Sequence, residues 1–388
     1  MNNNPIDLTI LVPSLNEEIT IAEFIDWCSQ GILKSGINAQ ILIIDSSSDQ
    51  TPYIAKNKGV DVLTVAKRGL GRAYIDSIPH IKGKWIIMGD ADLTYDFREI
   101  SPFIEAFRKG ADFVMGSRFL GTIEHGSMPY LHRYFGTPLT TWILNKIYES
   151  KYSDIHCGMR GITKDALHKI DMKSQSWEYA SEMVLKAARL GLNTVEVPVN
   201  FYKDRDGRLS HHRRMGWMSP WIAGWINLKV MLVYSPDTFL LKPGLAIFLV
   251  GLILSCSLSF GPLVIAGIKL NIYWMLLGVT MTTLGYSCIQ IGVIAQIMHR
   301  LRSTYSKRFL ELLTYNRGAI TSLAFIVAGL LPVILLVRQY ISNEYKLYTL
   351  PLSAVFGLLL IIIGFQTFCF TLLLEMSSRV GFGLNDNK

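Results

Sequence analysis

The sequence contains few cysteines and does not arrange them for a disulfide or metal framework. Its 388 residues include no C-x-x-C pair, and three of the five cysteines lie in long apolar stretches; the five are Cys28, Cys157, Cys256, Cys288 and Cys369. This pattern excludes a disulfide-stabilised secreted scaffold and fits reduced thiols in a cytoplasmic setting. His132, His156 and Cys157 match no usual zinc spacing, so a zinc site is not expected.

The first residues also do not have the pattern of a cleavable secretory signal. The first residues are polar, and the apolar run in "IDLTILVPSLNEE" is short and ends in two acidic residues. A signal peptide needs a basic start and a longer apolar centre. We therefore expect the first two hundred residues to form a soluble head.

Charged residues are scarce in four long apolar runs, at about 245–267, 274–298, 319–338 and 349–374. Each run has roughly the 20 residues that cross about 30 Å of hydrocarbon. Buried helices of a large soluble core are the alternative, but runs with so few interior charges are hard to bury in that way. We expect a head over 1–210, a juxtamembrane segment over 211–240 and a membrane domain with four transmembrane helices over 241–388.

The basic residues between these runs predict the orientation of the chain in the membrane. The link 299–318 carries five Lys or Arg residues, whereas the link between the first two runs has only Lys269. The third link, with Arg338 and Lys346, argues weakly. The positive-inside rule then places the 299–318 loop, the head and the C-terminal tail in the cytoplasm, and we expect a multi-pass protein of a bacterial plasma membrane.

The net charge of +8 points to an anionic partner, and with four membrane runs the partner is expected to be a lipid leaflet and not nucleic acid. Trp217, Trp221 and Trp225 recur at intervals of four beside several arginines. On a helix they form one stripe, which suits a helix lying in the membrane interface. An amphipathic core helix is the alternative.

The head alternates short apolar runs with amphipathic segments. The strand candidates are 8–15, 39–46, 60–66, 84–90 and 112–118, and helical patterns such as 17–36 and 51–58 lie between them. Such runs predict an α/β domain with a parallel sheet covered on both faces. Ligands bind at the carboxyl ends of the strands in open sheets of this kind, and Asp45, Asp90 and Arg118 fall at such ends.

The stretch "IIMGDADLTYD" places Asp90 and Asp92 directly after a buried strand. Two carboxylates in this spacing repel each other unless a cation offsets the repulsion, and oxygen ligands suit Mg²⁺ or Mn²⁺. In "KRGLGRAY" nearby, Gly69 and Gly71 allow close backbone approach beside three basic residues, which would suit a diphosphate. The segment matches neither the Walker nor the Rossmann pattern, so an ordinary turn stays equally open.

Six segments in order resemble family-2 glycosyltransferases with the GT-A fold. These are "ILVPSLNEE", "IIDSSSDQT", "KRGLGRAYIDSI", "GDADLTYD", "MGSRF" and "WEYASEMVLKAARLGLNTVEVPV", within about residues 7 to 215. More closely the chain resembles dolichyl- or polyprenyl-phosphate hexosyltransferases. "GSMPYLHRYFGTP" and "DIHCGMRG", followed by four spans, resemble a bacterial membrane-anchored branch of that group.

The resemblance implies a donor side built around the two carboxylates. Asp90 and Asp92 would hold the metal on the nucleotide diphosphate, and Asp45 would contact the base or ribose. Ile44 stands where the family usually has the first of two aspartates, so the nucleotide stays open. Other donor-binding positions would be Pro13, Glu17, Gly69 and Gly71.

The resemblance also implies an acceptor side rich in arginine. Arg118 and Arg133 would face phosphates, and with Asp92 they form the expected catalytic set. The expected acceptor residues are Arg133, Thr137, Glu182, Arg205 and His211, although Glu182 could equally be an ordinary helix-face residue. Four further arginines, Arg160, Arg208, Arg213 and Arg214, lie in the same part of the chain.

The implied activity is a metal-dependent, inverting transfer of a hexose from UDP-glucose, GDP-mannose or a similar nucleotide sugar to a polyprenyl phosphate. Transfer to another lipid, and polysaccharide synthesis, are alternatives; "RRMGW" lacks the glutamine of the Q-x-x-R-W motif of processive synthases. An inactive binding module is a further alternative, but the intact Asp90, Asp92 and Arg118 argue against it. Association into a homo-oligomer is possible.

Overall fold

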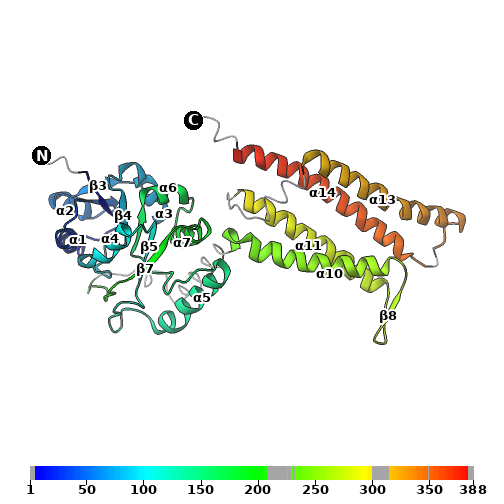
Figure 1. Cartoon of the computed structure of the whole chain (residues 1–388), viewed down its shortest axis with the longest axis horizontal. Helices are drawn as coiled ribbons and strands as arrows, with labels where there is room; N and C mark the ends of the chain where they lie inside the picture. The colour runs from blue at the N-terminus through cyan, green and yellow to red at the C-terminus, as the bar shows by residue number, and fades with distance from the viewer. Residues whose placement is uncertain are drawn as a thin grey trace. The chain divides into compact units, whose positions relative to one another are not determined.

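The computed structural model describes residues 5–205, 207, 225, 229, 232–298, 314–347 and 349–382. The chain divides into two compact units, Met1–Tyr234 and Ser235–Lys388, and each is described by itself (Figure 1). His211, Trp217, Trp221 and most of the basic 299–318 loop lie outside the described residues. The tryptophan stripe and the orientation in the membrane therefore stay predictions.

The first unit is built on one seven-stranded sheet in the order β3-β2-β1-β4-β6-β5-β7. The five strands expected from the sequence are confirmed as β1 (Leu8–Ser14), β2 (Ala39–Asp45), β3 (Asp61–Thr64), β4 (Trp85–Met88) and β5 (Phe113–Ser117). Only β6 (Arg160–Thr163) runs antiparallel to its neighbours, β4 and β5, while β7 (Thr194–Pro198) pairs in parallel with β5. The head is thus an α/β domain with the mostly parallel sheet of the GT-A fold.

The side chains of the central strands are buried on either side of the sheet, since helices cover both of its faces. Every residue of β1 except Pro13 is buried. The covering helices are α1 (Ile21–Ser35), α2 (Thr51–Asn57), α3 (Leu70–Ser77), α4 (Ser101–Arg108), α6 (Lys164–Ile170) and α7 (Tyr179–Arg189). Polar side chains follow the parallel strands at the edge formed by their carboxyl ends.

One long connection leaves and rejoins the sheet at that edge. It runs from the end of β5 to the start of β6 and contains a π-helical turn, η3 (His132–Gly136), followed by α5 (Thr137–Tyr148). The loop 149–159 then leads into β6. The connection therefore carries two of the expected acceptor residues, Arg133 and Thr137.

The second unit contains four helices that are long and apolar enough to cross a membrane, Asp237–Leu258, Ile272–Ile297, Tyr315–Ser342 and Leu352–Ser377. They correspond to η4 (Asp237–Leu241) with α10 (Lys242–Leu258), to α11 (Ile272–Met298), to α13 (Tyr315–Ser342) and to α14 (Leu352–Phe382). The four expected spans are thereby found in number and order within the described residues.

The first span is shorter than the sequence suggested. It ends at Leu258 and not near 267, because Gly261 has a φ of +136° and Pro262 follows it. The apolar residues beyond form a hairpin of β8 (Leu263–Ile265) and β9 (Ile268–Leu270). The apolar run thus predicted a membrane span but not the residue at which the span ends.

Glycines bring the helices of the second unit together in pairs. A Cβ on Gly285 of α11 would lie 2.4 Å from the backbone nitrogen of Phe248 in α10. On the other pair, a Cβ on Gly329 of α13 would lie 2.5 Å from the carbonyl oxygen of Gly357 in α14. Small residues allow this close approach, which is a common way for helices to associate in membranes.

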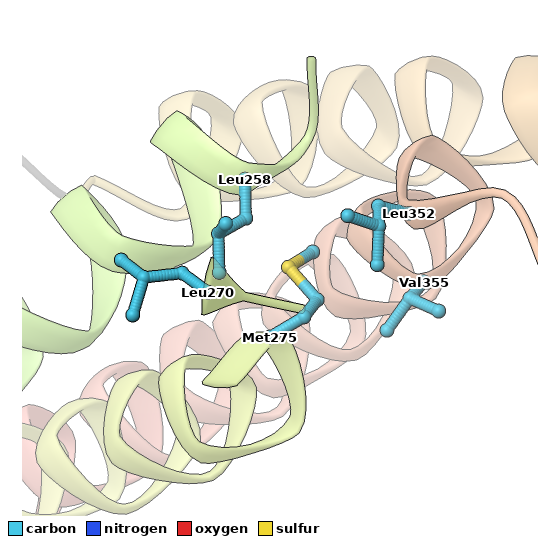
Figure 2. Close-up of a cluster of buried hydrophobic side chains, with 5 residues drawn as sticks. All are labelled: Leu258, Leu270, Met275, Leu352 and Val355. Atoms are coloured by element: carbon cyan, nitrogen blue, oxygen red, sulfur yellow. The ribbon is translucent and has the colours of Figure 1, made fainter. Parts of the chain in front are cut away.

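An apolar cluster and a few polar contacts connect the two pairs. Figure 2 shows Leu258, Leu270, Met275, Leu352 and Val355, which form a buried cluster from α10, β9, α11 and α14. Further along, the Tyr286 hydroxyl lies 2.7 Å from that of Thr367. These contacts join α11 to α14, so the four helices form one bundle.

Candidate active site

Two loops at the carboxyl edge of the sheet are joined by hydrogen bonds. The Asp45 carboxylate is fully buried and accepts from the Ser14 hydroxyl at 2.9 Å and from the backbone N–H of Ser47 at 3.2 Å. The backbone N–H of Glu17 donates to the Thr51 hydroxyl at 2.9 Å. These hydrogen bonds fix the loops after β1 and β2, where a base or ribose contact is expected.

Asp90 and Asp92 lie in a tight turn after β4, and both are half-buried. Leu93 between Asp92 and Thr94 has a φ of +64°, which is uncommon for a residue with a side chain. Asp92 holds this turn by accepting from the backbone N–H of Thr94 at 3.0 Å and from its hydroxyl at 2.5 Å. The strained turn keeps the two carboxylates together and partly open to solvent.

The 154–159 loop packs against Asp90. A Cβ on Gly158 would lie 2.8 Å from an oxygen of the Asp90 carboxylate, so a larger residue there would displace that side chain. The backbone N–H of Gly158 donates to the Tyr95 hydroxyl at 2.7 Å. Burial raises the pKa of Tyr95 well above its ordinary value, so this hydroxyl stays neutral and holds the loop over the carboxylates.

The donor set suits a hard divalent cation. Among the residues that the structure describes, no three His, Cys, Asp or Glu side chains gather as a complete metal cluster. Magnesium commonly takes one or two carboxylates and completes its shell with substrate phosphates and water. Two half-buried carboxylates on this turn fit that mode, and the role of Asp90 and Asp92 as protein ligands of Mg²⁺ or Mn²⁺ stays a prediction.

The expected phosphate turn at Gly69 and Gly71 packs against this chain's own backbone. A Cβ on Gly69 would lie 2.3 Å from the carbonyl oxygen of Gln175, and one on Gly71 would lie 2.2 Å from that of Ser174. The backbone N–H of Arg72 also donates to the Gln175 carbonyl at 2.9 Å. Both glycines are thus required for packing on the 174–176 segment, and their donor contact stays a prediction.

Arg118 does not present a free guanidinium to a phosphate. It is 8% exposed and forms a two-pronged ion pair with Asp154, from Nε at 2.7 Å and from Nη2 at 2.9 Å. Its backbone N–H donates to the same carboxylate at 3.2 Å. This buried pair fixes the loop before β6 to the end of β5, and the direct phosphate contact of Arg118 stays a prediction.

Arg133 is the expected phosphate ligand that the structure leaves available. Its half-buried guanidinium lies 5.5 Å from the centre of the Tyr134 ring, and it has no ion pair with an acid in the described part of the chain. Thr137, four residues on, begins α5 and is 5% exposed. A half-buried cation without a protein acid is a suitable partner for an anionic ligand.

Glu182 is held by contacts within the head, and its expected acceptor contact stays a prediction. Its carboxylate is fully buried, pairs with Lys186 at 2.5 Å and accepts from the backbone N–H groups of Lys173 and Ser174. Burial alone would raise the pKa of Glu182, but these hydrogen bonds and the Lys186 charge lower it below the ordinary value. Glu182 therefore holds the segment that packs on Gly69 and Gly71.

Two other arginines are also paired within the protein. Arg205 forms an exposed ion pair with Glu23, and its expected acceptor contact stays a prediction. Arg160 is 1% exposed and donates to the carbonyl oxygens of Ala180, at 2.8 Å, and Cys157. Both guanidinium groups contact groups of the chain itself, and His211 lies outside the described residues.

Comparisons with known proteins show the family of the chain. Residues 9–171 match the model of glycosyl transferase family 2, and residues 293–378 match the C-terminal transmembrane region of family 2 glycosyltransferases. The low-salt glycan biosynthesis hexosyltransferase Agl6 of Haloferax volcanii is 31% identical over 364 residues, which cover 92% of this chain and 86% of that protein. The chain belongs to the family 2 glycosyltransferases.

Other matches cover the head of this glycosyltransferase. A dolichyl-phosphate hexose transferase of Haloferax volcanii is 27% identical over 204 residues, 52% of this chain and 85% of that protein. A crystal structure of glucosyl-3-phosphoglycerate synthase from Mycobacterium tuberculosis with Mn²⁺, UDP and glucosyl-3-phosphoglycerate covers 59% of this chain and 80% of that one, at 19% identity and a TM-score of 0.46. With four candidate spans and a matched transmembrane region, the transferase is an integral membrane protein.

Sequence reasoning missed Asp154, Tyr95 and His156 as parts of the transferase site. The Nε2 atom of His156 lies 2.8 Å from the Thr140 hydroxyl, and its backbone N–H donates to Asp154 at 3.2 Å. His156 therefore ties α5 to the loop before β6. The segment "DIHCGMRG" held the signal, because a charged and glycine-rich stretch before a buried strand is rarely a plain surface loop.

His156 predicts an acid-dependent loss of stability. Burial lowers its pKa to about 4, against the attraction of Asp154 and with the help of Arg118 and Arg160. Because the unfolded chain has the ordinary pKa of about 6.5 and binds the proton first, stability is complete above about pH 6.5 and falls towards pH 4 by at most about 1.4 kcal/mol per pH unit. The free energy of unfolding of His156→Gln, measured with denaturant, should fall less steeply with decreasing pH in this window than that of the unmodified protein.

The matched control is His168→Gln, because His168 is exposed in α6. In this control, the free energy of unfolding should change with pH as steeply as in the unmodified protein. An unchanged pH dependence for His156→Gln would mean that the buried imidazole is not the group that titrates.

Proposed function

We propose that this glycosyltransferase moves a hexose from a nucleotide sugar to a polyprenyl phosphate, in a metal-dependent and inverting reaction. Two relatives support the proposal: one is named a hexosyltransferase and the other a dolichyl-phosphate hexose transferase. The resemblance of the site motifs to the same group agrees with them. UDP-glucose and GDP-mannose are the donor types to test first.

The observation that carries the proposal is the pair of half-buried carboxylates on the strained turn after β4, in a chain with four candidate spans. Asp90 and Asp92 lie at the sheet edge where ligands of such folds bind. A membrane-bound transferase lies close to acceptors that partition into the bilayer. A lipid phosphate is such an acceptor.

The bound cation would neutralise charge on the leaving diphosphate. The residues of the chain would do the rest: the Asp45 and Glu17 loops would hold the nucleoside, and Asp90 and Asp92 would fix the diphosphate end. Arg133 would hold the acceptor phosphate and so align its oxygen with the anomeric carbon. Positioning of this kind lowers the barrier by pre-ordering the two reactants.

No general base is required in this proposal. A lipid phosphate is already anionic at neutral pH, so its oxygen can attack without losing a proton first. The transferase must instead bring two anionic substrates together, and an arginine that is half-buried and not ion-paired in the described residues serves that purpose. Arg118 would act as a positioning residue through Asp154 and the loop that meets Asp90.

Replacing Arg133 by Ala tests the acceptor side. The change removes a charge-assisted contact of about 1.5–3 kcal/mol to the lipid phosphate, so transfer should fall about ten- to hundredfold. Lysine should rescue only partly, because a point charge does not copy the planar fork of arginine. Affinity for the nucleoside diphosphate with Mn²⁺, measured by calorimetry, should stay close to that of the unmodified protein.

Arg108→Ala is the matched control, since Arg108 is an exposed arginine in the last turn of α4. It should leave both transfer and nucleotide binding unchanged. If Arg133→Ala weakens nucleotide binding as strongly as it weakens transfer, Arg133 belongs to the donor side and the placement of the acceptor phosphate is wrong.

A further inference from the structure

An apolar and aromatic stripe lies exposed along the helical segment 130–148, which comprises a short lead-in, η3 and α5. Tyr130, Tyr134 and Trp142 are 70%, 67% and 58% exposed, and the first two rings are stacked with their centres 6.1 Å apart. The stripe residues recur on one side of the helix; they are Tyr130, Leu131, Tyr134, Phe135, Leu139 and Trp142.

The opposite side of the same segment faces the core of the head. Thr137, Thr141 and Leu144 are at most 5% exposed. The helix is therefore held by its own packing, and the stripe is not part of the hydrophobic core. So many large rings in contact with water are unusual for a soluble surface and indicate that something covers them.

The charged residues within the segment that carries the stripe are of one sign, and Glu149 follows at its end. From Pro129 to Tyr148 the sequence has no Asp or Glu, and its cations are Arg133 and Lys146 besides His132. The Lys146 ammonium lies 5.2 Å from the centre of the Trp142 ring, which places one cation at the border of the stripe. Aromatic rings rimmed by Lys and Arg are typical of helices that lie in a membrane interface.

We propose that the stripe of α5 and η3 docks the head flat on the anionic surface of the bilayer that the four helices cross. The chain passes from Tyr234, at the end of the first unit, to a span that begins at Asp237, so the head stays within reach of that bilayer. Anionic headgroups would neutralise the two cations. A second copy of the stripe fits less well, because it would oppose cations to cations.

This docking goes beyond the sugar transfer and does not depend on it. The stripe lies on the same helical segment as Arg133, so docking would hold that guanidinium at the depth of lipid headgroups. A head without a catalytic role would dock by the same contacts. The test therefore measures depth in the membrane and not activity.

The test places a single environment-sensitive fluorophore on the full-length protein in vesicles. Cys256, Cys288 and Cys369 are replaced by serine, while the fully buried Cys28 and Cys157 are kept. New cysteines replace Trp142 or Leu139 on the stripe, and Tyr53 of α2, which is 64% exposed, provides the control site. Vesicles of phosphatidylcholine with phosphatidylglycerol carry spin-labelled lipids as quenchers, and iodide serves as the aqueous quencher.

We expect lipid quenchers to reduce the signal from both stripe sites several-fold more than the signal from the Tyr53 site, with the reverse order for iodide. Lys146→Glu should weaken lipid quenching in vesicles that contain phosphatidylglycerol, whereas Lys109→Glu, an exposed change after α4, should not. Equal quenching at stripe and control sites overturns the proposal. So does protection from both quenchers with cross-linking between copies, which would make the stripe a protein interface.

Discussion

Asp92→Asn should reduce sugar transfer by about a thousandfold or more, because a metal ion contributes several kcal/mol to the stabilisation of a leaving diphosphate and about 4 kcal/mol corresponds to that factor. The fold should survive the change. Asparagine keeps a side-chain oxygen that accepts from Thr94, and Asp92 is half-buried and not locked in the core. Initial rates with radiolabelled nucleotide sugar and polyprenyl phosphate, and the unfolding temperature, are the measurements.

Chelation provides the companion experiment. EDTA should abolish transfer by the unmodified protein, and Mn²⁺ or Mg²⁺ should restore it. Asp26→Asn is the matched control, since Asp26 is a half-exposed aspartate that pairs with Lys58 on the surface of the head. Full transfer by Asp92→Asn in the presence of chelator would sink the metal assignment.

Asp154→Asn should lower the stability of the head by about 3–5 kcal/mol, the usual cost of removing one partner from a buried ion pair. The Arg118 guanidinium is 8% exposed and would remain charged opposite a neutral amide. The backbone N–H of His156 would also lose its carboxylate acceptor. Denaturant unfolding of the detergent-solubilised protein, followed by protease resistance of the head, measures the loss.

The exposed pair of Arg205 with Glu23 is the matched comparison, because both side chains are nearly half exposed. Glu23→Gln should cost less than about 1 kcal/mol, as surface ion pairs usually do. Replacing both buried partners, by Arg118→Met with Asp154→Leu, should recover much of the loss, since no unpaired charge remains. A single variant as stable as the unmodified protein would show that the pair does not hold the loop.

The sequence predicted the strands that their own residues mark as strands. β1, β2 and β4 are nearly continuous apolar runs, and parallel strands buried on both faces need such composition. β6 reads "RGIT" and begins with a charged residue, so no local pattern marks it as a strand. It becomes one because Met88 and Met115 of its two neighbours both pair with Arg160.

The candidate site was predictable in its position and less so in its contacts. The carboxyl ends of β2, β4 and β5 placed Asp45, Asp90 and Arg118 at one edge, as the structure confirms. The partner of an arginine depends on residues far along the chain, and Asp154 lies 36 positions from Arg118. For this reason sequence patterns located the basic residues but could not say which of them is already paired.

In the sheet of the head, the one antiparallel strand, β6, separates two parts of the enzyme that could change independently. Because β6 runs against β5, the segment 118–159 departs and returns at one edge, and the strands on either side of it pair without regard to its length. Within this family, the loop could be lengthened, shortened or exchanged while the nucleotide end of the sheet stays intact. Differences in the acceptor between family members would then lie in this one insertion, and differences in the sugar donor in the loops after β1, β2 and β4.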